Sequence, residues 1–248
     1  MMRAKKLLPA ARFTGELLLH ILFPRTCFAC GADLPFRYAD PLCPACRGAV
    51  RVPGPLICQR CGTVLPSGGA HCARCRGSKG KKFKCKVIRS AWLFGPQSRA
   101  LIHAFKYSGY AFLADYLGAQ MARRFKELPE LAAAQVVVPV PLYPKRQKWR
   151  GYNQSELLAR AFARKVHLPV ESRCLVRVRD TAAQAKLHRQ ERLDNMSGAF
   201  AATADVRGKT VLLIDDVATT GATLEGCAQA LREGGAKRVI AYTLAREP

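Results

Sequence analysis

The chain has 248 residues, of which 49% are hydrophobic, and its mean hydropathy is −0.05. This composition can build a folded core, which excludes extended disorder and collagen-like repeats. Its apolar runs are shorter than the roughly 20 residues that a transmembrane helix needs. Lysine and arginine total 41 against 17 acidic residues, so the net charge is +24. This excess favours a polyanionic partner: nucleic acid, a phosphorylated small molecule or an acidic membrane surface.

Residues 1–26 predict an N-terminal amphipathic helix, because basic residues precede the apolar run 17–23. A signal peptide has a similar order. However, Glu16 and His20 interrupt the apolar stretch, and no small-residue cleavage site follows it. We therefore expect a cytoplasmic protein whose cysteines stay reduced or hold metal.

Eight of the 11 cysteines form four Cys-x2-Cys pairs. Zinc binds four thiolates tetrahedrally, and each such pair presents two sulfurs from one turn. Grouping each Cys-x2-Cys pair with the next one along the chain predicts two closed, structural zinc sites. The alternatives are an interleaved grouping of the same pairs, disulfides, and a redox-active dithiol. The segment has no helical or strand period, so we expect metal to hold its fold together. The eight candidate ligands are Cys27, Cys30, Cys43, Cys46, Cys58, Cys61, Cys72 and Cys75.

Positive charge is concentrated near these cysteines, since residues 1–90 contain 17 basic and three acidic residues. Neutralised phosphates release counterions, so this segment predicts salt-sensitive binding of single-stranded DNA. Phe28, Phe36 and Phe83 could stack on bases. The alternative is that the aromatic residues fill a small core and the lysines are solvated. The lysines concerned are Lys79, Lys81, Lys82, Lys84 and Lys86.

After a basic linker at 76–86 the pattern changes to alternating strands and helices, which predicts a mostly parallel α/β sheet. A helix cap is expected at Asn153 or Ser155. The expected strands are 87–94, 136–138, 172–178, 209–216 and 238–244, and the expected helices are 98–106, 112–125, 155–166 and 223–233.

The most specific motif is the segment 211–223, Val-Leu-Leu-Ile-Asp-Asp-Val-Ala-Thr-Thr-Gly-Ala-Thr. A hydrophobic strand is expected to deliver Asp215 and Asp216 at its carboxyl end, before a turn that opens a helix. Backbone N–H groups at a helix start bind phosphate, and Gly221 lets the backbone come close. The carboxylates would accept from sugar hydroxyls or face Mg²⁺. The alternative is an ordinary turn with two surface acids.

This motif resembles the loop of type I phosphoribosyltransferases that binds 5-phosphoribosyl 1-pyrophosphate (PRPP). The resemblance implies that Asp215 and Asp216 contact the ribose hydroxyls and that Mg²⁺ accompanies PRPP. It further implies that the 5-phosphate is held by Ala218, Thr219, Thr220, Gly221, Ala222 and Thr223.

Segments 138–159, 177–184 and 189–195 narrow this resemblance to the ComF family of late-competence proteins. That family joins a Cys-rich zinc module to a phosphoribosyltransferase-like domain. It implies three parts: the helix at 1–26, a double zinc ribbon with linker at 27–86, and a phosphoribosyltransferase-like domain at 87–248 with helices on both faces of its sheet.

The same resemblance assigns two basic segments to the ligand, one beside the pyrophosphate and one in a mobile loop that closes over the sugar. The pyrophosphate-side residues are Lys145, Arg146, Lys148 and Arg150, and the mobile-loop residues are Arg177, Arg179, Lys186, Arg189 and Arg192.

The ComF resemblance implies a PRPP-binding protein of DNA uptake and natural transformation that handles single-stranded DNA, with a competence helicase or other uptake proteins as partners. The alternatives are an active phosphoribosyltransferase that transfers phosphoribosyl to a nucleobase-like acceptor, and a structural zinc adaptor. Thr219 stands where purine-salvage enzymes have an aspartate. Orotate-like chemistry would instead use a mobile-loop lysine, for which Lys186 is the candidate catalytic residue.

Overall fold

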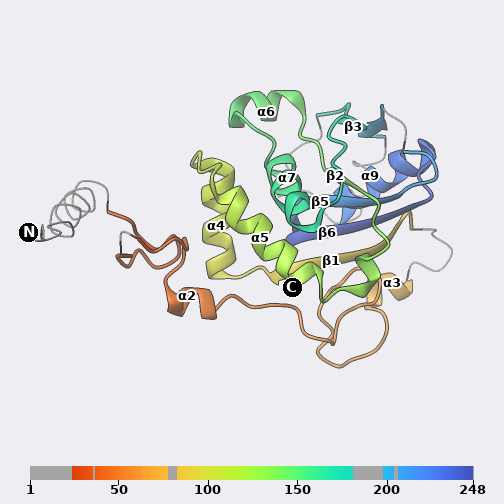
Figure 1. Ribbon diagram of the computed structural model, residues 1–248. Coiled ribbons are helices and arrows are strands. Elements are labelled where there is room, and N and C mark those ends of the chain that lie inside the picture. The colour runs from red at the N-terminus through yellow and green to blue at the C-terminus, as the bar shows by residue number, and fades with distance from the viewer. Residues whose placement is uncertain (1–23, 36, 78–82, 181–197, 204–205, 248) are drawn as a thin grey trace, which may run out of the picture. The chain divides into compact units, whose positions relative to one another are not determined.

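A computed structural model describes residues 24–35, 37–77, 83–180, 198–203 and 206–247 (Figure 1). The chain divides into two compact units, residues 1–50 and residues 51–248. Residues 1–23 of the predicted N-terminal helix lie outside the described residues, and residues 24–26 are not helical. Within the described part, no helix is both long and apolar enough to cross a membrane.

The first unit contains a small ribbon built around the turn from Cys27 to Cys30. An antiparallel bridge between Thr26 and Asp33 closes this turn. A one-turn helix, α2 (Pro44–Gly48), then starts at Cys43, whose sulfur accepts from the backbone N–H of Cys46. This helix was not predicted, because five residues are too few to show a hydrophobic period.

The second ribbon repeats this construction but belongs to the second unit. An antiparallel bridge between Ile57 and Val64 surrounds the turn that carries Cys58 and Cys61. The short helix α3 (Ala73–Gly77) takes the place that α2 has in the first ribbon. The repeated cysteine spacing therefore gives a repeated local structure.

The second unit is organised around four parallel strands in the order β1 (Cys85–Leu93), β6 (Arg238–Arg246), β5 (Thr210–Ala218) and β2 (Val136–Pro139). The prediction of a mostly parallel sheet is confirmed. These strands are largely buried, which explains why they appear in the sequence as nearly continuous apolar runs. A separate antiparallel pair joins β3 (Leu175–Arg177) to β4 (Phe200–Ala202). The expected strand 172–178 is therefore shorter than predicted.

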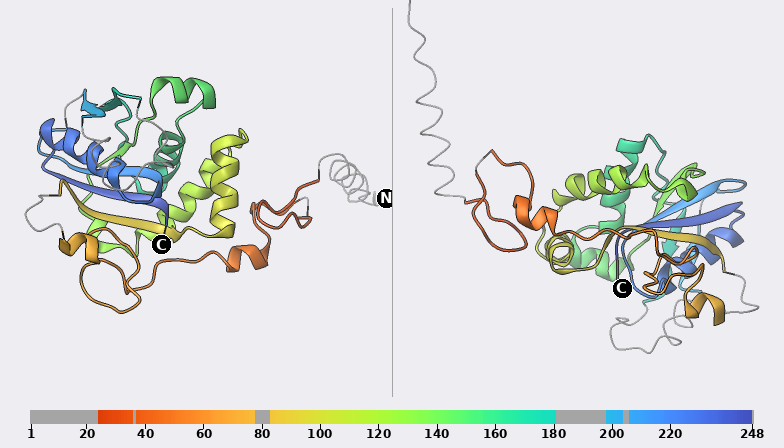
Figure 2. Two further views of the ribbon diagram at one scale, coloured as in Figure 1. Left: turned by 180° about the vertical axis from the view of Figure 1, so that it is seen from behind. Right: turned by 90° about the horizontal axis from the view of Figure 1, so that it is seen from below.

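Helices cover both faces of the sheet, as the family resemblance implied. Figure 2 shows α9 (Ala222–Glu233) on the face opposite α5 (Leu113–Phe125) and α7 (Gln154–Val166). Successive side chains of a strand point to opposite faces. Tyr242 of β6 accordingly packs against Phe125 and Phe162, whereas its neighbour Ala241 belongs to the core cluster beneath α9.

Three further helices complete the second unit: α4 (Pro96–Tyr107), the 3-10 turn η1 (Pro129–Leu131) and α6 (Pro144–Arg150). The ends of α4, α5, α7 and α9 lie within two residues of the predicted bounds.

Candidate PRPP site and zinc centres

Asp215 and Asp216 lie inside β5 rather than at its end, which corrects the prediction. The strand continues to Ala218, and its pairing with β6 runs through both acids. Their residues are only 8% and 3% exposed. The two carboxylates are therefore held by the sheet and are not surface acids.

Lys106 in the last turn of α4 faces Asp216, with 2.8 Å between its Nζ and Oδ2 of the aspartate. Burial lowers the pKa of Lys106, but the charge and hydrogen bond of Asp216 outweigh this and raise it above its usual value. The sequence analysis did not identify this residue. A lysine at the end of an amphipathic helix is ordinary, and no motif marks its contact with β5.

Ser155 at the start of α7 donates its hydroxyl to Asp215 Oδ1 at 2.8 Å, and the backbone N–H of Asp216 donates to the same oxygen at 2.9 Å. Asn153, not Ser155, caps α7 with its side chain, so the serine hydroxyl is available for this bond. Burial and the neighbouring Asp216 carboxylate nevertheless raise the pKa of Asp215 to about 7.

The predicted phosphate loop, residues 218–223, comprises the last residue of β5, the turn from Thr219 to Gly221 and the first two residues of α9. Gly221 has a φ of 76°, a left-handed conformation that favours glycine. The hydroxyl of Thr220 accepts from the N–H of Ala222 at 3.3 Å. Because the loop continues from β5, the N-terminus of α9 opens at the sheet edge next to the two acids.

Glu225 in the first turn of α9 fixes this helix to the start of β1. Its carboxylate accepts the backbone N–H of Lys84 at 2.5 Å and that of Cys85 at 3.2 Å. No sequence pattern marks this contact, since an acid in the first helical turn is common without any partner.

The predicted pyrophosphate-side loop is helical over its second half, where it forms α6. Pro144 starts this helix, and Gly151 ends it in a left-handed conformation with a φ of 84°. Arg150 donates to Gln154 Oε1 at 2.5 Å, and its guanidinium lies 5.0 Å from the centre of the Tyr107 ring. Both Lys145 and Lys148 of this helix are exposed.

Arg177, predicted in a mobile loop, belongs to β3, where it pairs with Phe200 and lies 5.5 Å from the centre of that ring. Burial and nearby Arg146 lower the pKa of Arg177, while Asp215 acts in the opposite direction. Arg177 therefore lies within the electrostatic range of both Arg146 and Asp215, and Arg146 itself forms an ion pair with Asp180 at 3.9 Å. Arg179 follows β3, and Lys186, Arg189 and Arg192 lie outside the described residues.

Each group of four cysteines gathers its sulfur atoms within 4.8 Å of one another. Two of these approaches are 3.8 Å, from Cys30 to Cys43, and 3.7 Å, from Cys61 to Cys72. The sequential pairing is therefore confirmed, and the interleaved alternative is wrong. The first centre is Cys27, Cys30, Cys43 and Cys46, and the second is Cys58, Cys61, Cys72 and Cys75.

Backbone N–H groups stabilise the thiolate of one cysteine in each centre, whereas the pKa values of Cys46 and Cys75 are raised. Burial raises the pKa of Cys27, but the N–H groups of Cys43 and Cys30 outweigh this and lower it to about 6. Burial likewise opposes the N–H groups beside Cys58, which lower its pKa to about 5. The thiolate is the form that binds metal. Four such donors in a closed group fit structural zinc.

The second ribbon is bonded to the sheet of its unit. Arg246 at the end of β6 donates to the Thr63 hydroxyl from Nη2 at 2.6 Å and from Nε at 3.2 Å. The N–H of Ile88 in β1 donates to the carbonyl of Arg60 at 2.7 Å. A Cβ placed on Gly221 would lie 3.1 Å from Ile88 Cδ1. Ile88 therefore contacts both the ribbon and the phosphate loop.

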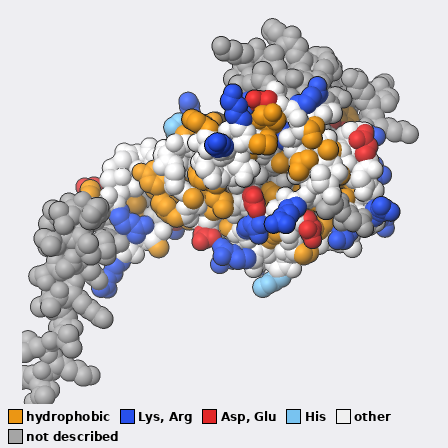
Figure 3. Space-filling view, turned by 90° about the horizontal axis from the view of Figure 1, so that it is seen from above, with side chains coloured by type: hydrophobic (Ala, Val, Ile, Leu, Met, Phe, Trp, Pro, Cys, Tyr) orange, Lys and Arg blue, Asp and Glu red, His pale blue; other side chains and the backbone are white. Residues whose placement is uncertain are grey.

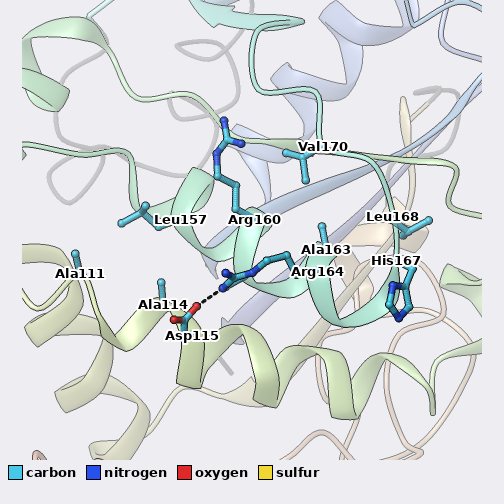
Figure 4. A pocket seen from close by; sticks show the side chains of 11 residues that line it. Ala111, Ala114, Asp115, Leu157, Arg160, Ala163, Arg164, His167, Leu168 and Val170 are labelled. Atoms are coloured by element: carbon cyan, nitrogen blue, oxygen red, sulfur yellow. Dashed lines mark hydrogen bonds and ion pairs between the residues drawn. The ribbon is translucent and has the colours of Figure 1, made fainter.

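Figure 4 shows a separate pocket between the start of α5 and α7. Arg160, Arg164 and His167 line it together with small apolar side chains, and Arg164 forms an ion pair with Asp115. The pocket includes none of the residues predicted to bind PRPP, so it is distinct from the carboxylate site.

Two family models match the chain: a phosphoribosyl transferase domain over residues 153–248 and a double zinc ribbon domain over residues 18–76. The chain is 30% identical over 228 residues to the DNA utilization protein YhgH of Escherichia coli K12, covering 90% of this chain and 97% of the relative. It is also 30% identical over 227 residues to competence protein F of Haemophilus influenzae, covering 89% and 96%. The chain belongs to the ComF family. A further relative of this ComF-family protein is competence protein ComFC of Bacillus subtilis, which is 29% identical over 212 residues, 84% of this chain and 85% of the relative.

Proposed function

We propose that this ComF-family protein binds PRPP together with Mg²⁺ at the carboxyl end of β5. One observation carries the proposal: two buried, adjacent carboxylates lie in the second half of β5, the strand from which the chain continues through Gly221 into the start of α9. Asp215 and Asp216 would accept hydrogen bonds from the ribose hydroxyls. The loop from Ala218 to Thr223 and the N-terminus of α9 would hold the 5-phosphate.

The donor set suits a divalent cation, because carboxylate oxygens are the ligands that Mg²⁺ prefers. A cation or a pair of hydroxyl donors would favour the ionised form of Asp215, whose pKa is raised to about 7. The diphosphate would interact with the cations of α6 and β3, of which Arg177 already lies within the electrostatic range of Asp215.

We propose a role in DNA uptake and natural transformation, in which the protein handles single-stranded DNA in the cytoplasm with other uptake proteins as partners. The names of the relatives, competence protein F and DNA utilization protein, support this role. The net charge of +24 suits a nucleic-acid ligand. In the basic segment that the sequence pointed to, Arg60 lies over the ring of Phe83 at 4.3 Å.

A second candidate function is phosphoribosyl transfer with release of pyrophosphate. It is favoured by Lys106, a buried cation 2.8 Å from Asp216, and by Arg177 near Asp215. Fixed cations of this kind stabilise developing negative charge on a leaving diphosphate. In this alternative, Lys186 of the predicted mobile loop is the candidate catalytic residue.

Calorimetric titration with PRPP, with and without Mg²⁺, tests the first proposal. We expect Mg²⁺-dependent binding that weakens at least about tenfold in the double variant Asp215→Asn/Asp216→Asn, because a hydrogen bond to a charged group contributes roughly 1.5–3 kcal/mol. Asp115→Asn, an exposed acid in the separate pocket, is the matched control and should bind normally. Undiminished affinity in the double variant would refute the assignment.

Pyrophosphate release distinguishes the two functions. The parent protein is incubated with Mg²⁺, PRPP and a panel of nucleobases, with and without single-stranded DNA. Release that depends on one base favours the transferase, whereas binding without release favours PRPP as a ligand of the DNA-handling protein.

A further inference from the structure

Four aromatic side chains are exposed to an unusual degree. Tyr107 is 54% exposed, Tyr110 42%, Phe112 64% and Trp149 74%. These are the large exposed aromatic residues of the part of the chain that the structure describes. Three of them follow one another across the turn from α4 to α5, and Trp149 comes from α6. We refer to these four residues as the aromatic surface.

Ring contacts organise the aromatic surface. The rings of Tyr107 and Trp149 are 6.3 Å apart between centres, and those of Tyr110 and Phe112 are 5.7 Å apart at nearly a right angle. Arg150 lies against the Tyr107 ring at 5.0 Å. Tyr152 ties α4 to the end of α6, since its hydroxyl donates to the carbonyl of Phe105. The rings are thus presented by secondary-structure ends that are bonded to each other.

The two chain segments that carry the aromatic surface are basic, although the exposed Asp115 directly follows the first of them. Neither residues 90–114 nor residues 131–155 contain an acidic residue. Lys145 and Lys148 are exposed on α6 beside Trp149. Figure 3 looks onto the side of the second unit that bears α6 and shows hydrophobic side chains interspersed with Lys and Arg and with several Asp or Glu side chains. The basic residues of these two segments are Arg99, Lys106, Lys145, Arg146, Lys148 and Arg150.

The aromatic surface adjoins the carboxylate site from two directions. Tyr107 directly follows Lys106, whose Nζ is 2.8 Å from Asp216. Arg150 bonds Gln154, which directly precedes the Ser155 that donates to Asp215. The chain segments that present these rings are therefore bonded to the carboxylate site through neighbouring residues.

We propose that the aromatic surface is a stacking platform for the bases of single-stranded DNA, an inference that rests on the proposed DNA-handling function. Exposed rings among cations are how proteins bind single strands without sequence preference, because every base offers a π face and every linkage a phosphate. A protein partner would also bury aromatic side chains, but the exposed Lys145 and Lys148 beside Trp149 match a polyanion better. This surface lies outside the lysine segment 79–86 that the sequence pointed to.

The chain supplies its own optical probe for the test. It contains two tryptophans, of which Trp92 is 5% exposed and Trp149 is 74% exposed. Stacking of bases on Trp149 should quench its fluorescence. We therefore titrate the full-length, zinc-loaded protein with oligothymidylate and follow tryptophan emission, using Trp149→Phe to subtract the signal of Trp92.

Affinity is measured in parallel by anisotropy of a labelled oligothymidylate. We expect Trp149→Ala to weaken binding about 5-fold or more, the lower end of what one stacked base contributes. Trp149→Phe should retain most of the affinity. Leu56→Ala, which truncates a side chain that is 54% exposed elsewhere, should have no effect. An abasic oligonucleotide of the same length should bind the parent protein and Trp149→Ala equally.

Two results would overturn the proposal. Equal affinity of the parent protein and Trp149→Ala for oligothymidylate, without quenching, would show that DNA binds elsewhere and would leave a protein contact as the use of this surface. Absence of oligothymidylate binding by the parent protein would remove the DNA-handling function itself. PRPP titration of Trp149→Ala serves as the folding control. A correctly folded variant should bind PRPP with the affinity of the parent protein, so any loss of oligothymidylate binding then reflects the missing ring.

Discussion

The two zinc ribbons are built on the same turn but differ in what surrounds it. Gly31 and Gly62 each follow a Cys-x2-Cys pair by one position, with φ values of 74° and 73°. A Cβ on Gly31 would meet nothing within 4 Å, whereas a Cβ on Gly62 would lie 2.7 Å from the carbonyl oxygen of Ile88. The first ribbon lies in the compact unit 1–50, and the second lies in the unit that contains the sheet.

This difference shows that identical metal-binding turns can have different structural roles. The second ribbon is part of the packing of β1 and β6, through Ile88 and through the bonds from Arg246 to Thr63. Ile88 also contacts the position of Gly221 in the phosphate loop. We therefore expect the second zinc centre, but not the first, to support the proposed PRPP site.

The largest effect is expected from removing one zinc centre at a time. Cys58→Ser/Cys61→Ser should abolish the cooperative unfolding transition of the second unit or lower its midpoint strongly, because structural zinc contributes roughly 10 kcal/mol in small zinc domains. The matched variant Cys27→Ser/Cys30→Ser should leave that transition in place. Calorimetry with metal analysis checks this, and each variant should retain about one zinc equivalent. Equal destabilisation of the second unit by the two variants would contradict the conclusion that only the second ribbon supports the sheet.

Alanine at the two equivalent glycines sharpens the comparison. Gly31→Ala adds only the cost of a left-handed conformation, about 1–2 kcal/mol. Gly62→Ala adds a steric clash with the Ile88 carbonyl, and overpacking costs a further 1–3 kcal/mol or so. Urea unfolding of both variants should therefore show the larger loss at Gly62. A similar loss of unfolding free energy at both positions would mean that the second ribbon accommodates the added methyl group as easily as the first.

The pH dependence of stability should arise in the second unit, where Asp215 lies. Its pKa is raised from 3.8 to about 7 in the folded state, so the folded protein binds more protons than the unfolded chain between these values. The free energy of unfolding therefore falls as the pH rises from about 4 to about 7. The Asp215→Asn side chain retains an oxygen that accepts from the Ser155 hydroxyl. Because it does not ionise, it removes this pH-dependent fall in the free energy of unfolding.

At pH 8 the Asp215→Asn variant should be more stable than the parent protein by up to about 4 kcal/mol, at about 1.4 kcal/mol per pKa unit. The difference should shrink towards zero near pH 4. Urea unfolding at both pH values measures it. A stability difference that does not change with pH would contradict the buried, raised-pKa environment of Asp215.

The smallest effect is expected from the hydroxyl that joins ribbon and sheet. Thr63→Val keeps the shape but removes the acceptor of Arg246, which is only 2% exposed. We expect the free energy of unfolding to fall by about 2 kcal/mol, because the buried guanidinium of Arg246 is left with one hydrogen-bond partner fewer. Thr63→Ser, which keeps the hydroxyl, is the control and should be close to the parent protein in thermal unfolding.

The sequence predicted the features that depend on local pattern. Cysteine spacing predicted both zinc centres, and the apolar runs predicted β1, β2, β5 and β6, because hydrophobic period and ligand spacing are local properties. Long-range contacts were not predictable in this way. Lys106 meets Asp216 across 110 positions, and Ser155 meets Asp215 across 60. The burial of the two acids within β5 likewise depends on the pairing of β5 with β6, which no single segment reveals.

The aromatic surface shows the same limit. Tyr107 and Trp149 are 42 positions apart, and each alone is an ordinary residue near a helix end. Only the folded chain places their rings together and leaves both exposed.

The most direct test of the central claim is the PRPP affinity of the two glycine variants. The claim is that Asp215, Asp216 and the loop at Gly221 bind PRPP and that the second ribbon holds this loop through Ile88. Titration calorimetry with Mg²⁺ and PRPP is performed on the parent protein, Gly31→Ala and Gly62→Ala. Circular dichroism confirms folding, and Thr63→Val serves as the second ribbon variant if Gly62→Ala unfolds. We predict parental affinity for Gly31→Ala and a loss of about 5-fold or more, equivalent to about 1 kcal/mol, for the ribbon variant. Unchanged affinity in a folded Gly62→Ala protein, or no PRPP binding by the parent protein, would contradict the account.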